Sequence, residues 1–148
     1  MSVYDFKTGE EMRIPQDEDP AREFEGKLGK RMTVNDPQSN MELLHNALFV
    51  KDHEAMIRDF EHVEDLRSWT RQMLMAFGCI DEREWSRMED DDYFDEMLWA
   101  YFQSLRATDG IKGFIAFTYM KLIGMADLQN KLKAYEDAEQ AGEFEWKK

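Results

Sequence analysis

The distribution of proline divides this chain into two parts. All three prolines, Pro15, Pro20 and Pro37, lie within residues 1–38. This segment has neither the two-residue period of a strand nor the 3.6-residue period of a helix, and its apolar side chains stand singly. Such a segment cannot bury a core of its own. We therefore predict an extended or disordered N-terminal arm, which is either a disordered leader or an arm that becomes ordered on a partner or a sister subunit.

Residues 39–142 lack proline and carry apolar side chains at helical spacing. Ser39 followed by Glu42, and Asp81 followed by Glu84, have the spacing of a capping box, in which two side chains satisfy free backbone N–H groups at a helix start. No stretch alternates polar and apolar residues as a half-buried strand does. The expected fold class is all-α, a compact bundle of about five to six helices preceded by the irregular arm.

Three of the expected helices end at a glycine. A long helix is predicted over 52–78, with Asp52 as its cap. Its inward stripe is Met56, Phe60, Val63, Arg67, Thr70, Leu74 and Phe77. A helix that is apolar on nearly all sides is predicted over 111–124, so it should be the most buried element. A last helix is predicted over 127–142, followed by an acidic and aromatic tail at 143–148. Glycine suits these ends because it adopts the left-handed conformation that closes many helices.

The chain is strongly acidic, with a net charge of −13 and a pI near 4.6. Close binding of nucleic acid needs clustered Lys and Arg, so we expect no direct nucleic-acid partner and instead a protein with a basic surface. The longest apolar run, 111–125, is too short and too charged to span a bilayer, so no membrane partner is expected. The first residues lack the features of a signal peptide. These features predict a cytoplasmic protein.

Acidic side chains are concentrated at residues 81–96, which hold nine acids and two bases. One or two carboxylates stabilise a helix start, and we expect Asp92 to cap the helix that follows. The other acids exceed that need, so something positive must offset their repulsion. A basic partner would do so. The lysines that could do so internally are Lys112, Lys121, Lys131 and Lys133.

The same helix carries a large aromatic side chain in an unexpected position. On a helical wheel Trp99 falls on the polar face, and tryptophan is enriched at the centres of protein interfaces. We combine it with the surplus acids and with aromatic residues of the arm. The predicted partner-binding residues are Asp90, Asp91, Asp95, Glu96, Trp99, Tyr4, Phe6 and Phe24.

A different hypothesis uses carboxylates as metal ligands. Glu61 and Glu64, followed by Glu89 and Asp92, have an E-x-x-E and E-x-x-D spacing that resembles the all-helical MazG-like nucleotide pyrophosphatases. The resemblance implies that these four residues are catalytic and that they hold Mg²⁺, which binds a triphosphate and activates water. It covers these four residues alone, and two aspartates replace the leucine and glycine that the family has between its second pair of acids.

No other motif for a metal, a cofactor or a nucleophile is recognised, so none is expected outside the Mg²⁺ hypothesis. The leading hypothesis is a non-enzymatic, acidic protein-protein interaction module that docks through its arm and an acidic helical face. It would be an adaptor, assembly factor or inhibitor of the kind that phages and mobile elements encode. A DNA mimic that inhibits a nucleic-acid-binding protein is one alternative, and the Mg²⁺-dependent pyrophosphatase is the other. A homo-oligomer is compatible with either interaction role.

Overall fold

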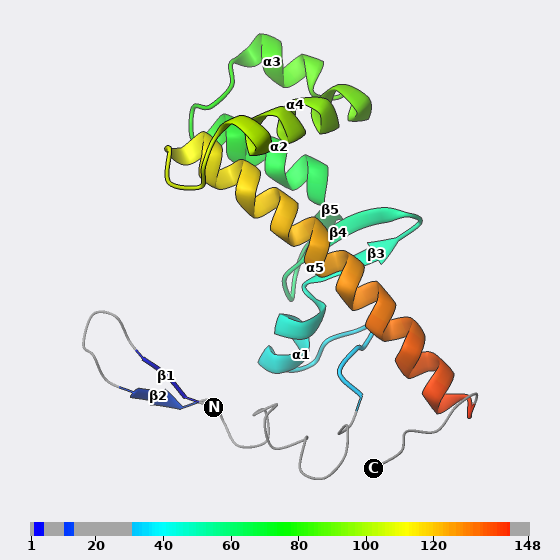
Figure 1. Ribbon diagram of the computed structural model, residues 1–148. Coiled ribbons are helices and arrows are strands. Elements are labelled where there is room, and N and C mark those ends of the chain that lie inside the picture. The colour runs from blue at the N-terminus through cyan, green and yellow to red at the C-terminus, as the bar shows by residue number, and fades with distance from the viewer. Residues whose placement is uncertain (1, 5–10, 14–30, 143–148) are drawn as a thin grey trace. The chain divides into compact units, whose positions relative to one another are not determined.

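The computed structural model describes residues 2–4, 11–13 and 31–142 (Figure 1). This part of the chain holds five α-helices and two antiparallel sheets, so the prediction of an all-α fold is wrong. The elements are β1 (Ser2–Tyr4), β2 (Glu11–Arg13), α1 (Asn40–Asn46), β3 (Leu48–Lys51), β4 (Glu54–Arg58), β5 (Val63–Asp65), α2 (Leu66–Ala76), α3 (Glu82–Arg87), α4 (Asp91–Ser104) and α5 (Ile111–Gln140).

The chain comprises two compact units, residues 1–46 with 131–148, and residues 47–130. Helix α5 contributes residues to both of them. The predicted division into an arm, a helical domain over 39–142 and a tail stays a prediction. Most of that arm and the whole tail at 143–148 lie outside the described residues.

The structure has a three-stranded sheet in the order β3-β4-β5, and strands β4 and β5 occupy the first half of the helix predicted over 52–78. Strands β3 and β4 are joined by the turn Asp52–His53, in which both residues have positive φ (51° and 65°). Positive φ at both central residues is what a tight two-residue hairpin turn requires. Asp52 therefore begins a hairpin turn and caps no helix. Phe60 and Val63, expected on the buried stripe of that helix, are each 56% exposed.

Local capping signals hold where the sequence predicted them. The Ser39 hydroxyl accepts from the backbone N–H of Glu42 at 3.1 Å, and the Asp81 carboxylate accepts from that of Glu84 at 2.8 Å. Helix α2 ends at Ala76, and Gly78 follows with a φ of 71°. Cys79 donates its backbone N–H to the Leu74 carbonyl at 2.8 Å, so this helix end is a Schellman motif.

Helix α5 is continuous from Ile111 to Gln140, whereas the sequence predicted one helix that ends at Gly124 and another that begins at Asp127. Gly124 thus lies inside a helix. The predicted end at Gly142 is confirmed, because Gly142 has a φ of 77° and follows the last turn. The prediction that the first half of this helix is surrounded on all sides is wrong, since Phe114 is 53% exposed.

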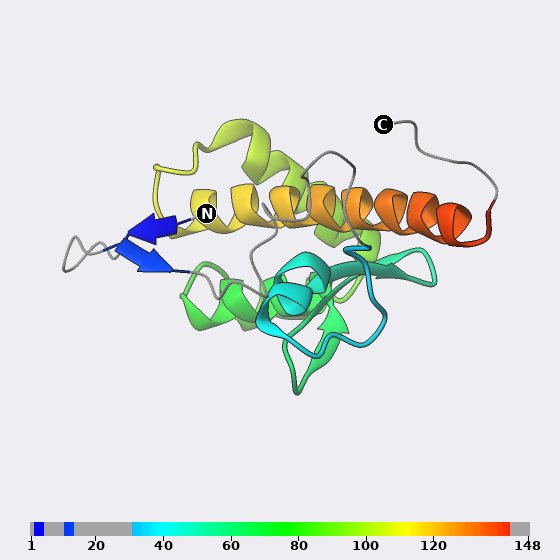
Figure 2. The same cartoon turned by 90° about the horizontal axis from the view of Figure 1, so that it is seen from below.

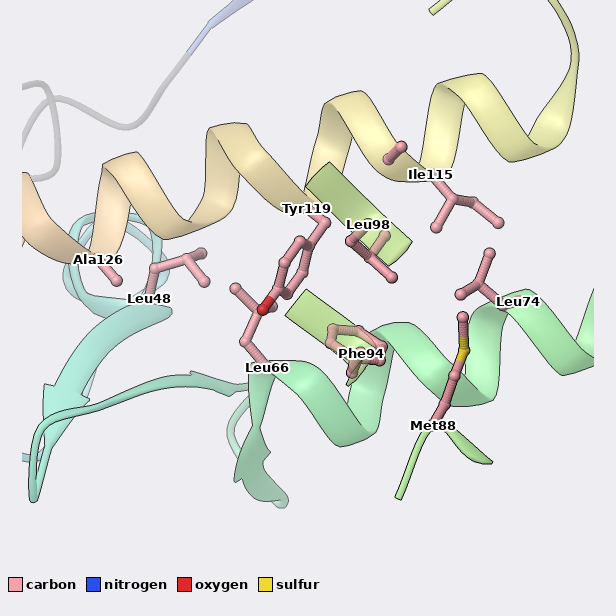
Figure 3. Packing of buried hydrophobic residues seen from close by; sticks show 10 residues of the cluster. Leu48, Leu66, Leu74, Met88, Phe94, Leu98, Ile115, Tyr119 and Ala126 are labelled. Atoms are coloured by element: carbon pink, nitrogen blue, oxygen red, sulfur yellow. The ribbon is translucent and has the colours of Figure 1, made fainter. Parts of the chain in front are cut away.

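The core of residues 47–130 lies where α2, α4 and the sheet meet α5 (Figure 3). Helix α4 runs beside the N-terminal half of α5 in both views (Figures 1 and 2), and the Phe94 and Tyr119 rings make an edge-on contact at 5.3 Å. The buried apolar residues are Leu48, Leu66, Leu74, Met88, Phe94, Leu98, Ile115, Ala116, Tyr119 and Ala126.

The unit of residues 1–46 and 131–148 has contacts between residues 31–33 and the last turns of α5. The Glu136 carboxylate accepts from the backbone N–H groups of Met32 and Thr33, each at 2.8 Å. Arg31 forms an ion pair with Asp137, and this hydrogen bond is the largest cause of a lowered pKa at Asp137. Residues 31–33 are therefore fixed to the last turns of α5. Among the described residues, no helix has the length and apolar character needed to cross a lipid bilayer.

Candidate protein-binding groove

Arg67, near the start of α2, is the centre of an ion-pair network. Its Nε and Nη2 donate to the two carboxylate oxygens of Asp95 at 2.8 and 2.9 Å, and its Nη1 donates to Glu54 at 2.7 Å. An oxygen of Asp91 lies 3.5 Å from Nη1. The hydrogen bond to Asp95 raises the pKa of Arg67 well above its usual value, although burial opposes this shift. One guanidinium thus connects α2 with α4 and β4.

A second arginine neutralises the acid at the end of α3. Arg71 donates to Glu89 at 3.2 Å and to the backbone carbonyl of Trp85 at 3.0 Å, and its guanidinium lies 3.7 Å from the centre of the Trp85 ring. Arg87 lies 3.6 Å from Glu84. The positive charges that offset the acid block therefore come from arginines of α2 and α3. Sequence analysis had pointed to lysines, and none of the ion pairs described for residues 81–96 involves a lysine.

The acids of the predicted patch have different roles. Asp90 is the N-cap of α4 and accepts from the backbone N–H groups of Asp92 and Tyr93 at 3.0 and 3.3 Å, so the prediction of Asp92 as the cap is wrong by two residues. Asp95 is bound to Arg67. Within the described part of the chain, no ion pair is found for Asp92 or Glu96. These two carboxylates are exposed and remain available to a partner.

Trp99 lies at the edge of a pocket of about 500 Å³, which we call the Trp99 pocket. Its side chain is 51% exposed and packs against Phe102 with the ring centres 5.7 Å apart. The other residues that line the pocket are Arg67, Asp95, Glu96, Tyr119, Met120 and Ile123. The lining thus combines apolar side chains with the carboxylates of Asp95 and Glu96.

A second pocket of about 430 Å³ lies beside the β3–β4 hairpin, and we call it the hairpin pocket. Its lining includes His53, Glu54, Arg67, Tyr119, Ile123 and Asp127. Tyr119 is almost fully buried under both pockets, and this burial raises the pKa of its hydroxyl well above the usual value. The nearby Asp95 carboxylate raises it further.

The structure brings together part of the predicted partner-binding set. Asp95, Glu96 and Trp99 line one pocket, and Asp91 borders the same ion-pair network. Tyr4 belongs to strand β1. Phe6 and Phe24 lie outside the described residues. The role of all these residues in binding stays a prediction.

The carboxylates of the pyrophosphatase hypothesis come from a turn, a strand and the segment that leads into α4. Glu61 lies in the turn between β4 and β5, and Glu64 lies in β5, where it accepts a hydrogen bond from Gln72. Glu89 is paired with Arg71, and Asp92 lies in the first turn of α4. The first pair is therefore not on a helix, and the described residues include no cluster of three or more His, Cys, Asp or Glu that could hold a metal ion.

Sequence analysis missed Arg67 as a site residue, although a signal for it was present. Arg67 stood on a stripe of otherwise mostly apolar positions, and a cation at an inward position must be paired with acids. On this basis Arg67 could have been predicted to form ion pairs with some of the surplus carboxylates. The residues that the β3–β4 hairpin contributes to the hairpin pocket could not be predicted in this way, because a helix was expected over that segment.

Comparison of the chain with protein-family models, with curated proteins and with solved structures finds no significant match.

Proposed function

We propose that this chain is a non-enzymatic, acidic protein-interaction module that docks a basic partner on the face of α4 around the Trp99 pocket. One observation carries the proposal, a half-exposed tryptophan that lines a largely apolar pocket together with the exposed carboxylate of Glu96, for which no ion pair is found among the described residues. Tryptophan and neighbouring apolar walls give binding energy at the centre of an interface, while charges at its rim select the partner and speed association.

The balance of charges favours this role over that of a DNA mimic. A mimic needs many carboxylates that stay free to meet a basic cleft. Here Arg67, Arg71 and Arg87 already pair with acids of the block, so fewer free charges remain. The apolar pocket has no part in mimicry of a phosphate backbone, whereas it suits an anchoring side chain of a protein partner.

The finer parts of the proposal rest on the sequence. They are a cytoplasmic location, a contribution from the arm, and a role as an adaptor, assembly factor or inhibitor that a phage or mobile element encodes. The free carboxylates of α4 give the partner its expected chemistry, a surface rich in Lys and Arg.

The proposal is tested by capture of the partner with matched variants of the full chain. Trp99→Ala removes the anchor, and Phe60→Ala removes an equally exposed aromatic side chain (56% against 51%) from the β4–β5 turn. We expect the wild type and Phe60→Ala to capture the same partner and Trp99→Ala to lose it. For the purified pair, the loss should be at least about 2 kcal/mol, roughly a 30-fold weaker Kd.

The charged rim is tested separately. Glu96→Gln should weaken binding by about 1 kcal/mol or less and should reduce its dependence on salt, because a rim charge acts mainly through long-range attraction. Glu61→Gln, which removes an exposed carboxylate in the β4–β5 turn, is the control and should change neither quantity. A partner that binds Trp99→Ala as tightly as the wild type would contradict the proposal.

A further inference from the structure

The Trp99 pocket and the hairpin pocket are neighbours. Both lie within residues 47–130, and both are lined by Arg67, Tyr119 and Ile123. Three shared lining residues place the two pockets side by side over the same short stretch of α2 and α5. We treat the pair as one groove, in which a single ligand that spans Arg67 would place one side chain in each pocket.

The two ends differ in chemistry. The Trp99 pocket has walls of Trp99, Met120 and Ile123, which suit a large apolar side chain. The hairpin pocket has an apolar floor that includes Leu66 and carries the carboxylates of Glu54 and Asp127 at its edge. A long basic side chain fits such a site, because its methylene stem lies along apolar surface while its charged head reaches a carboxylate.

The charge of the groove selects a cationic ligand. Its lining carries four carboxylates (Glu54, Asp95, Glu96 and Asp127) and one guanidinium (Arg67), a net charge of −3 with His53 neutral. Arg67 is already engaged by Glu54 and Asp95, so it offers little attraction to an anion. Among the described residues, no ion pair is found for Asp127, whose carboxylate is exposed. A second copy of a chain that carries −13 is a poor occupant.

We infer that the groove binds a peptide segment of the partner that places a Lys or Arg side chain in the hairpin pocket and a large apolar side chain in the Trp99 pocket. This inference rests on the proposed function and adds the chemistry of the segment. Asp127 is the residue that recognises the basic side chain without disturbing the Arg67 network, since Asp127 has no contact with that arginine among the hydrogen bonds and ion pairs described for it.

The test begins with selection of random 12-residue peptides displayed on phage against the full-length chain. We expect the enriched peptides to share a Lys or Arg close to a Trp, Phe, Leu or Met. One enriched peptide is then synthesised twice, once as selected and once with norleucine in place of its basic residue. Both are titrated by fluorescence polarisation against the wild type, Trp99→Ala, Asp127→Asn and the control Phe60→Ala.

Asp127→Asn should weaken the selected peptide by about fivefold, the upper range for a partly exposed ion pair, and should leave the norleucine peptide unchanged. Trp99→Ala should weaken both peptides. Enriched peptides without a basic residue, an equal effect of Asp127→Asn on both peptides, or no enrichment at all would overturn the inference. The proposed function survives the first two outcomes if Trp99→Ala still weakens binding, and it fails if Trp99→Ala has no effect.

Discussion

Replacement of Gly124 by alanine tests the continuity of α5, on which both pockets depend. Gly124 lines the hairpin pocket and lies inside the helix, where a glycine costs roughly 0.5–1 kcal/mol relative to alanine. An added Cβ would meet no atom within 4 Å, so no steric clash opposes the gain in helix stability. We therefore expect Gly124→Ala to raise the free energy of unfolding by about 0.5–1 kcal/mol.

Gly113, in the first turn of the same helix, is the matched counterpart. A Cβ there would lie 2.2 Å from the backbone carbonyl oxygen of Arg106, which no side-chain movement can relieve. Overpacking of this kind costs typically 1–3 kcal/mol, and the gain in helix propensity returns up to about 1 kcal/mol of it. We expect Gly113→Ala to lower the free energy of unfolding by about 1–2 kcal/mol.

Urea unfolding followed by circular dichroism and by tryptophan fluorescence measures both variants. If the two units unfold separately, the transition of residues 47–130 is the relevant one. A loss of more than about 0.5 kcal/mol in the free energy of unfolding of Gly124→Ala would contradict a continuous α5. That result would mean that Gly124 has the left-handed conformation of a helix end, as its sequence position suggested.

Two further predictions concern the groove. In a double-mutant cycle, Arg67→Met and Asp95→Asn should be coupled by about 1–2 kcal/mol in urea unfolding, because two charge-assisted hydrogen bonds join these half-buried side chains, and strictly additive effects would contradict the network. The raised pKa of Tyr119 predicts a loss of stability at alkaline pH. Below pH 10 the hydroxyl is neutral in both states and its contribution is fully present, whereas above pH 10 the unfolded chain ionises first and stability falls by up to about 1.4 kcal/mol per pH unit. Tyr119→Phe should therefore have a shallower decline above pH 10, and an unchanged slope would count against the burial of this hydroxyl.

Features that depend on neighbours in the sequence could be predicted well. Ser39, Asp81 and Gly142 mark helix ends because their side chains or their backbone freedom act within one turn. The hairpin was missed because its turn, Asp52–His53, contains no glycine to announce two positive φ values. At Gly124 a helix end was predicted where the helix continues, because a glycine inside a helix and a glycine at its end cannot be distinguished in the sequence.

The candidate site was predictable only in part, and for a similar reason. Trp99 and Glu96 lie one turn apart on a single helix, so a helical wheel identified them as an exposed pair. The partners of Asp95 and Glu89 could not be identified from spacing, because Arg67 and Arg71 come from another helix. Long-range pairing of this kind follows from the tertiary fold, which a wrong assignment of β3 and β4 had obscured.

Occupation of the Trp99 pocket by the partner can be followed at the methionine methyl groups. Met120 lines this pocket, whereas Met125 is exposed on α5 and lines neither pocket. We would label the methionine methyl groups with ¹³C, assign these two by substitution with leucine, and titrate the full chain with the captured partner. We expect a large shift of the Met120 methyl resonance and little change at Met125. Saturated binding that leaves Met120 unchanged would contradict it.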